Sequence, residues 1–305
     1  MLTIIIPCFN EGQNIELVIN KTDKILENTG IHYEYLFIDD GSIDNTWENI
    51  NKIAKVDKRV KAISFSRNYG KEAALQSGLN HATGDCVVIM DCDLQHPPDI
   101  IPEMYRKWEE GYEIVEGKKI SRGKESFLHR MSANIFYEIM SSTIGIDMKN
   151  ASDYKLLDRK AVNALNKYHE HCYFYRALSS GLGFKKAYVE FQVMDRTNGN
   201  SKWSLKSLIR YAINNITANT EAPLYMPSVI IMIISFLTMI FFLYRFNNIF
   251  SKPILYFIIT TFLLIMGITS IMGIMGYYIG KIYQEVKNRP FYIIRELIGI
   301  ERKES

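Results

Sequence analysis

Met90-Asp91-Cys92-Asp93-Leu94-Gln95-His96-Pro97-Pro98 is the stretch that points to the fold class, because two carboxylates directly follow an apolar run. That run, Cys86-Val87-Val88-Ile89-Met90, has the length and composition of a buried strand. A strand ending in this way brings two hard oxygen ligands to one edge of a sheet, where they suit a divalent ion that bridges to a diphosphate. An Asp-x-Asp pair is also common at solvated strand ends, so the pair alone does not establish a site.

Three earlier apolar runs also end in polar or glycine-bearing turns. They are Leu2–Ile6, Tyr35–Ile38 and Val60–Phe65, which close on Pro7–Gly12, Asp39–Ser42 and Ser66–Lys71 respectively. Apolar residues at helical spacing lie between the runs, over 14–26, 45–54 and 72–81. Strands that alternate with helices predict a parallel sheet with its ligand at the carboxyl ends of the strands. The chain has neither G-x-G-x-x-G nor G-x-x-x-x-G-K-[ST], so no standard dinucleotide fold or P-loop is predicted.

Four motifs occur in the order in which one known family carries them. They are Pro7-x-Phe9-Asn10-Glu11, Asp39-Asp40-Gly41-Ser42, Ser66-Arg67-Asn68-Tyr69-Gly70-Lys71-Glu72-Ala73-Ala74 and Asp91-x-Asp93-Leu94-Gln95-His96-Pro97. Together they resemble the family 2 inverting glycosyltransferases, whose GT-A fold is an α/β nucleotide-sugar-binding domain with a mostly parallel sheet. The closer resemblance is to the polyprenyl-phosphate sugar transferases, a group that includes dolichyl-phosphate mannose synthase and bacterial undecaprenyl-phosphate glucosyltransferases. This resemblance covers the whole chain, including its apolar end.

Charge and hydropathy divide the 305 residues into two unlike parts. The net charge of +3 is nearly balanced, so nucleic acid is not an expected partner. No charged residue occurs over 222–244 or over 253–280, and each stretch exceeds the roughly 20 apolar residues that span a bilayer. A buried core helix is the alternative for either one. We expect a catalytic domain over 1–200, an interfacial amphipathic helix over 201–221, a two-helix transmembrane hairpin over 222–280 and a C-terminal tail over 281–305.

Basic residues precede and follow the predicted hairpin, at the two helix ends that face the catalytic domain. They are Lys202, Lys206 and Arg210 before it and Lys281, Lys287 and Arg289 after it, whereas the loop between the helices carries Arg245 and Lys252. The positive-inside bias therefore predicts a multi-pass plasma-membrane protein with its catalytic domain and C-terminus in the cytoplasm. Gly276-x-x-x-Gly280 offers a small-residue face for helix packing, although glycine is also simply tolerated in membrane helices. A short strand over 291–294 is a candidate for self-association, which would make the protein a homo-oligomer.

The resemblance implies roles for residues at the strand ends. Asp91, Asp93 and Gln95 would surround Mg²⁺ or Mn²⁺, with Asp93 also counted as catalytic. The nucleotide sugar would be bound by Pro7, Phe9, Glu11, Asp39, Asp40, Lys71, Asp91 and Cys92, although Asp39 could instead hold its loop together. Cys92 is weaker as a ligand, because its side chain should point away from those of its two neighbours in a strand. The four cysteines show no C-x-x-C spacing and the histidines form no cluster, so zinc is not expected.

Basic residues later in the chain are assigned to phosphates. Arg196 and Lys202 belong to a match to the family's Arg-x-x-Gly-x-Ser-Lys motif and would contact the donor diphosphate, unless this is an exposed basic loop. Arg122 and Arg130 resemble the arginines that bind the acceptor phosphate, and a solvated charged face is their alternative.

Asp153, in Ser152-Asp153-Tyr154-Lys155-Leu156, occupies the place where inverting relatives keep a catalytic base. A hydroxyl acceptor needs such a base, whereas a phosphate acceptor is already ionised, so Asp153 either deprotonates or orients the substrate. Lys155 stands where Arg is commoner, and it cannot form the bidentate fork of a guanidinium.

The leading expectation is a membrane-bound enzyme that transfers a hexose or N-acetylhexosamine from a nucleotide sugar, preferably UDP-linked, to undecaprenyl or another polyprenyl phosphate. The lipid-linked sugar would serve the modification of cell-envelope glycans. A processive polysaccharide synthase normally carries Gln-x-x-Arg-Trp, whereas Gln192 and Arg196 are one residue too far apart. A nucleotidyltransferase would show a glycine- and basic-rich N-terminal loop, whereas Pro7–Gly12 is acidic. A catalytically silent membrane scaffold that binds nucleotide sugar is the third alternative.

Overall fold

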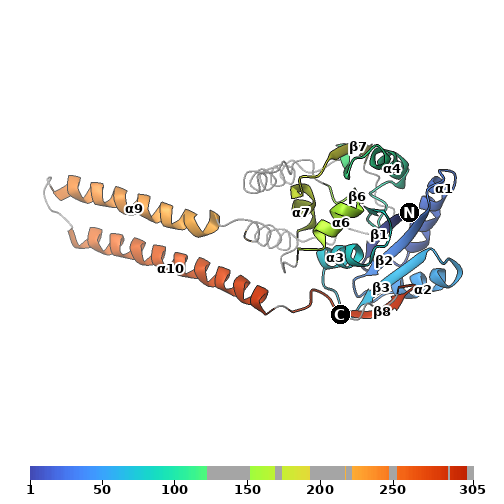
Figure 1. Ribbon diagram of the computed structural model, residues 1–305. Helices are drawn as coiled ribbons and strands as arrows, with labels where there is room; N and C mark the ends of the chain where they lie inside the picture. Colours follow the sequence, from blue (N-terminus) through green and yellow to red (C-terminus); the bar gives the residue numbers. More distant parts are fainter. Residues whose placement is uncertain are drawn as a thin grey trace. The chain divides into compact units, whose positions relative to one another are not determined.

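The chain forms two compact units in the computed structural model (Figure 1). The first comprises Met1–Ser207 together with Pro290–Ser305, and the second comprises Leu208–Arg289. The structure describes residues 1–121, 152–168, 174–192, 217, 222–246, 253–287 and 289–300. The predicted site residues Arg122, Arg130, Arg196 and Lys202 lie outside the described residues, as does the helix expected over 201–221 apart from Thr217.

The first unit is built on an eight-stranded sheet of order β7-β5-β6-β4-β1-β2-β3-β8. Its strands are β1 (Leu2–Cys8), β2 (Tyr33–Asp39), β3 (Val60–Phe65), β4 (Cys86–Ile89), β5 (Ile114–Ser121), β6 (Lys155–Asp158), β7 (Lys186–Gln192) and β8 (Ile294–Ile298). The neighbours β3-β2-β1-β4 are all parallel, and β5 is parallel to β7. The strands β6 and β8 are antiparallel to their neighbours. The predicted α/β fold with a mostly parallel sheet is therefore confirmed.

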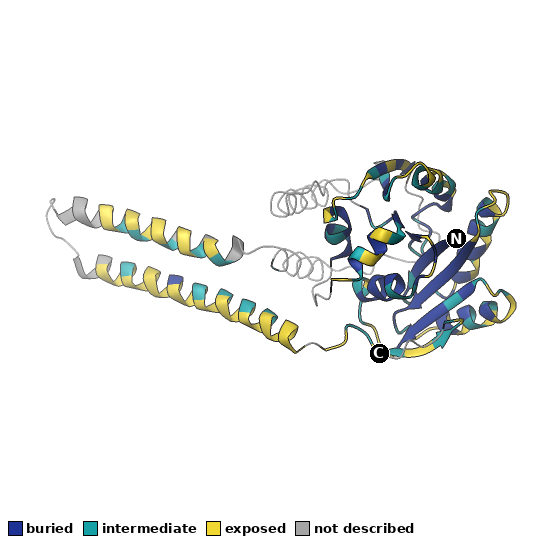
Figure 2. Cartoon of the chain, viewed as in Figure 1, coloured by how far each residue is buried: buried dark blue, intermediate teal, exposed yellow. Residues whose placement is uncertain are grey.

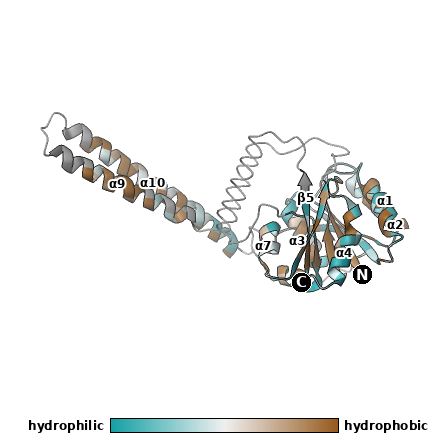
Figure 3. Cartoon of the chain, turned by 90° about the horizontal axis from the view of Figure 1, so that it is seen from above, coloured by the Kyte–Doolittle hydropathy of each residue, from teal (hydrophilic) through white to brown (hydrophobic). Residues whose placement is uncertain are grey.

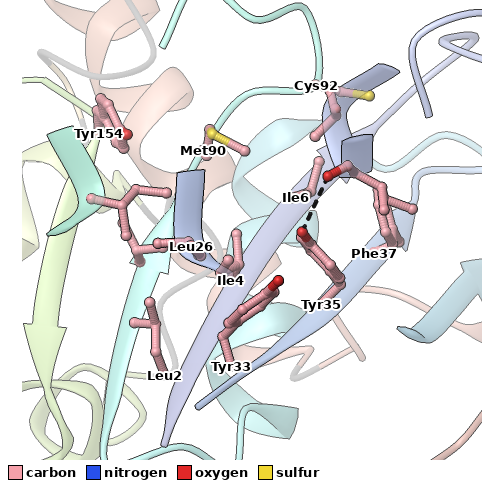
Figure 4. Packing of buried hydrophobic residues seen from close by; sticks show 14 of the residues in the cluster. Leu2, Ile4, Ile6, Leu26, Tyr33, Tyr35, Phe37, Met90, Cys92 and Tyr154 are labelled. Carbon is pink, nitrogen blue, oxygen red and sulfur yellow. Dashed lines mark hydrogen bonds between the residues drawn. The ribbon is translucent and has the colours of Figure 1, made fainter. Parts of the chain in front are cut away.

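Helices cover both faces of this sheet, because the inner strands are apolar on both sides (Figure 2). The described helices of this unit are α1 (Ile15–Leu26), α2 (Thr46–Val56), α3 (Lys71–His81), α4 (Ile101–Glu109), α6 (Arg159–Leu165) and α7 (Tyr175–Gly181), with a 3₁₀ turn η1 at Pro98–Ile100. Leu2, Ile4 and Ile6 alternate along β1 and pack in one cluster with residues of β2, α1, α2 and α4 (Figure 4). Ile5 faces the opposite way, into the cluster formed with α3, α6 and α7. This two-sided burial fixes the register of the central strands, so their carboxyl ends meet at one edge.

The chain returns to the sheet after its last helix. Residues of β8 pair antiparallel with β3, at the edge of the sheet (Figure 1). The Tyr292 ring stacks on Phe65 with centroids 4.8 Å apart, and the Ser66 amide donates to the Ile293 carbonyl at 2.9 Å. Trp47 Nε1 donates to Glu296 at 3.0 Å. The strand predicted over 291–294 is thus wrong in position. The observed strand β8 begins at Ile294 and pairs with β3 of the same chain.

The second unit contains two long helices, α9 (Ala222–Phe246) and α10 (Pro253–Val286), whose residues are predominantly apolar (Figure 3). Among the described residues, the stretch Phe257–Val286 alone is long and apolar enough to cross a membrane, and Pro227–Ile240 is a shorter apolar stretch. The close approach of the two helices occurs at Gly267, where a Cβ would lie 2.8 Å from Ile231. At Gly276 and Gly280 a Cβ would meet no heavy atom of the described residues within 4 Å, so close packing at this small-residue face stays a prediction.

Candidate functional site

Side chains from adjacent loops hold one another at the carboxyl edge of the parallel strands. The Asn10 amide donates to Ser42 Oγ at 2.9 Å, and the Ile43 amide donates back to Asn10 Oδ1 at 2.9 Å. The Glu11 amide donates to Thr46 Oγ1 at 2.9 Å. These bonds join the loop after β1, which carries Phe9 and Glu11, to the loop after β2. Pro7 lies at the end of β1 and is half-buried, as are Phe9 and Glu11.

The two aspartates after β2 differ in what they hold. Asp39 is 1% exposed and accepts from the Ser42 amide at 3.1 Å and from Ser64 Oγ at 2.9 Å. Asp40 accepts from the amides of Tyr69 at 2.6 Å and Gly70 at 2.8 Å. Burial raises the pKa of Asp40 to about 6, against the effect of these two amides. Asp39 thus closes its own turn, and Asp40 positions the backbone just before Lys71; contact of either one with a nucleotide sugar stays a prediction.

Gly41 joins these two loops without room for a side chain. Its φ is +67°, and a Cβ would collide with the backbone of Arg67. We expect Gly41→Ala to destabilise the protein by roughly 2–4 kcal/mol, since strain from the left-handed conformation adds to a backbone clash. Urea unfolding would measure the loss. Gly30→Ala is the matched control, because Gly30 has φ +72° but open space around its missing Cβ; an equal loss in the two variants would contradict the clash.

Lys71 lies at the start of α3 and bridges two carboxylates from distant parts of the chain. Its Nζ is 2.6 Å from Asp91 Oδ1 and 3.1 Å from Asp153 Oδ2. Arg176, from the first turn of α7, clamps Asp153 from the other side, with Nε donating to Oδ1 at 3.0 Å and an Nη to Oδ2 at 2.9 Å. The structure thus brings Asp91, Asp153 and Lys71 together, and adds Arg176 to them.

The charges in this cluster keep both carboxylates ionised. Burial raises the pKa of Asp153, but Arg176 and Lys71 outweigh it and hold the pKa well below the usual range. Burial likewise raises the pKa of Asp91, but the charge of Lys71 outweighs burial, so this pKa lies below its usual value. A carboxylate that is paired with two cations is a weak proton acceptor. The geometry therefore suits Asp153 to orienting and charge-balancing rather than to removing a proton.

His96 and Tyr154 connect the turn that carries Asp91 to the segment that carries Asp153, directly before β6. The Asp91 amide donates to His96 Nδ1 at 3.2 Å, so that nitrogen is an acceptor and the ring proton of the neutral form lies on Nε2. Burial lowers the pKa of His96, which favours this neutral form. The His96 ring stacks on Tyr154 with centroids 4.8 Å apart, and Tyr154 Oη donates to the Pro97 carbonyl at 2.7 Å.

The turn that carries Asp93 is held in a strained conformation. Leu94 has φ +59° while its side chain is 1% exposed, so packing compensates a backbone cost of about 1 kcal/mol. Asp93 Oδ1 accepts from the Gln95 amide at 3.1 Å, and both side chains are half-buried. Cys92 is 2% exposed and belongs to the apolar cluster (Figure 4), so its thiol packs away from the edge where its neighbours lie.

Arg176 is the residue that the sequence analysis missed. It follows no motif considered there and lies 23 positions beyond Asp153, so only the fold shows that they meet. No local signal in the sequence pairs the two residues. Lys155 is wholly buried, and its Nζ donates to Ser179 and Ser180 of α7, the helix that carries Arg176.

Comparisons with known proteins agree with this geometry. The family model described as Glycosyl transferase family 2 matches residues 3–173. The chain is 37% identical to the putative glycosyltransferase CsbB of Bacillus subtilis, over 97% of this chain and 92% of that one. It is 33% identical to the bactoprenol glucosyl transferase of Shigella phage SfII, over 97% of each chain. Glucosyl-3-phosphoglycerate synthase of Mycobacterium tuberculosis, crystallised with Mn²⁺, UDP and phosphoglyceric acid, shares the fold with TM-score 0.53 at 21% identity, over 71% of this chain and 76% of that one. The chain therefore belongs to glycosyl transferase family 2 and is a glycosyltransferase with the GT-A fold.

Proposed function

We propose that this protein transfers a hexose or N-acetylhexosamine, with inversion, from a UDP-sugar to a polyprenyl phosphate at the cytoplasmic face of the plasma membrane. The observation that carries the proposal is the neutralisation of Asp153 by Lys71 and Arg176. An acceptor hydroxyl would need a competent base at this position, whereas a phosphate monoester is already an anion. The apolar helix within Phe257–Val286 and the bactoprenol acceptor in the name of a relative point to a lipid carrier for that phosphate.

In the proposed reaction a phosphate oxygen of the acceptor attacks the anomeric carbon from the face opposite the diphosphate. The bond from that carbon to the diphosphate oxygen breaks, and UDP leaves with the electron pair. Lys71 lies beside Asp91 at the edge where the diphosphate would bind, so its positive charge would stabilise the leaving group. Arg122 and Arg130 are the proposed partners of the acceptor phosphate, and Arg196 and Lys202 those of the donor diphosphate.

A divalent ion fits the donor set at this edge. Asp93, Asp91 and Gln95 present carboxylate and amide oxygens, the ligands that Mg²⁺ and Mn²⁺ prefer. Since Lys71 already pairs with Asp91, we assign the principal contact to Asp93. No group of three or more His, Cys, Asp and Glu side chains within the described ranges is arranged to hold a metal. That fits a Mg²⁺-type site, in which one or two carboxylates share the ion with substrate phosphates. When bound, the ion would neutralise charge that develops on the diphosphate.

A radiolabel transfer assay tests the proposal. Membranes that contain the full-length protein would receive undecaprenyl phosphate, Mg²⁺ or Mn²⁺, and each of several labelled UDP- and GDP-sugars in turn. We expect one donor to label the lipid, and Asp93→Ala or EDTA to reduce labelling by about 10³-fold, since the ion's charge stabilisation is lost. Asp99→Ala is the matched control: it removes an exposed carboxylate of η1 outside the candidate site and should retain activity. Folded protein that labels no lipid with any donor would refute the proposal.

A further inference from the structure

The short helix α7 carries Arg176, and its own length does not explain how that arginine is held. It spans seven residues, Tyr175–Gly181, which is too short for a stable isolated helix. Its N-cap residue is Phe174, whose side chain has no oxygen that could accept from the first amides of the helix. Its position must therefore come from contacts with the rest of the domain, and the structure shows such contacts at both ends, including a bond from Lys186 Nζ to the Ser180 carbonyl at 2.5 Å.

At the first end, Glu72 of α3 accepts from the Tyr175 amide at 3.0 Å. Glu72 neighbours Lys71 in sequence, so the same turn of α3 supplies both the lysine of the site and an anchor for α7. At the second end, Lys155 Nζ donates to Ser179 Oγ at 2.9 Å and to Ser180 Oγ at 2.8 Å. The guanidinium of Arg176 leaves the helix between these two anchors and reaches Asp153.

Lys155 is unusual because its side chain is wholly buried, with 0% exposure. Burial lowers its pKa to about 8, against the opposing charge of Glu116, whose Oε1 lies 3.6 Å from Nζ. Glu116 Oε1 also accepts from the Ser152 amide at 2.7 Å. One buried network therefore holds the backbone before Asp153 and the last turn of α7. A buried ammonium is costly, and an apolar side chain would fill the same space more cheaply. A role in setting geometry accounts for its presence.

We propose that Lys155 is a positioning residue for the glycosyltransferase reaction: it holds α7 through Ser179 and Ser180, so that Arg176 meets Asp153 in bidentate geometry. Among the described residues, the hydrogen-bond and ion-pair partners of Lys155 Nζ are these two serines and Glu116, so its link to Asp153 in this role runs through α7, beside a longer-range attraction between the two charges. The two cationic residues have different roles. Lys155 fixes the position of the helix, and Arg176 supplies the planar, bidentate guanidinium that a lysine lacks.

A double-mutant cycle in the full-length protein tests this inference. Lys155→Met removes the ammonium at similar length, and Arg176→Met removes the fork. We expect either change to lower kcat by about 10- to 100-fold, the range that a small misplacement near the reacting groups produces, with little change in KM for the donor. The double variant should be scarcely slower than Arg176→Met alone. A purely structural role for Lys155 would instead make the two losses multiply, and that result would overturn the proposal, as would an unchanged kcat in folded Lys155→Met.

A second pair of variants covers the case in which Lys155→Met does not fold. Ser179→Ala with Ser180→Ala removes both acceptors and leaves the lysine, and the pair should show the same coupling to Arg176→Met. Ser77→Ala is the matched control, because Ser77 is buried in α3 and its hydroxyl has no partner among the described residues; kcat should be unchanged.

The kinetic measurements rest on the proposed transfer reaction. A second measurement is therefore chosen that does not depend on that reaction. The same cycle is measured on the free energy of unfolding in urea, where Lys155→Met should cost less once Arg176 is already methionine. A parent enzyme without transfer to any polyprenyl phosphate would refute the proposed function alone. Additive unfolding energies would refute the role of Lys155 alone.

Discussion

Lys71→Met is expected to abolish most of the transfer activity, by about 10²-fold or more, a loss comparable to that of a preorganised charge partner in other active sites. The reason is the position of Nζ between Asp91 and Asp153, at 2.6 and 3.1 Å. Without the ammonium, Asp153 keeps Arg176, but Asp91 loses the cation that lowers its pKa. Transfer of labelled sugar to lipid, measured at saturating donor, gives the change in rate.

The pH dependence of the residual activity gives this prediction a second test. Burial alone raises the pKa of Asp91, and Lys71 reverses that shift in the parent protein. Asp91 therefore stays ionised to lower pH in the parent protein than in Lys71→Met. The acid limb of the profile of rate against pH should move to higher pH in this variant. Lys61→Met is the matched control, because Lys61 of β3 also pairs with a carboxylate, Glu34, at 2.7 Å but outside the candidate site. Equal losses in the two variants would show that any broken ion pair suffices.

Ending the chain after Arg289 is expected to disable the catalytic domain although it removes none of the candidate site residues. The deletion takes away β8 and exposes the edge of β3. Six partly buried apolar side chains that pack against the two clusters are lost with it: Phe291, Tyr292, Ile294, Leu297, Ile298 and Ile300. At about 1 kcal/mol for each half-buried side chain, the free energy of unfolding should fall by roughly 6 kcal/mol, which is a large share of a typical domain's stability.

The same deletion should also impair the site before it unfolds the domain. Ser66 loses its bond to Ile293, and Phe65 loses the stack with Tyr292, directly before the loop that leads to Lys71. Urea unfolding and the transfer assay would follow the two effects. Tyr292→Ala should reproduce part of both, whereas Tyr292→Phe keeps the stacked ring and loses only a 3.4 Å contact with Asn80. A deletion variant of unchanged stability would contradict the account.

The parallel core was predictable because each of its strands is apolar on both faces and ends in a polar turn. Predicted and observed bounds coincide for β3 at Val60–Phe65, and the apolar run before Asp91 is β4, Cys86–Ile89. The strands β6 and β8 were harder to predict. Only four residues form β6, and the five residues of β8 follow the apolar helices, where nothing local indicates a return to the first sheet.

The family resemblance, the parallel core and the carboxylates at its edge were predictable, since they follow from local periodicity and from motifs of adjacent residues. The contacts of those carboxylates depend on the tertiary fold. The four charged residues of the site are distant in the chain. They come together because β4 ends just before Asp91, β6 begins just after Asp153, and α3 and α7 begin at or beside Lys71 and Arg176. The roles of Lys155 and of β8 were likewise decided by packing, because a buried ammonium or an edge strand has meaning only through its partners.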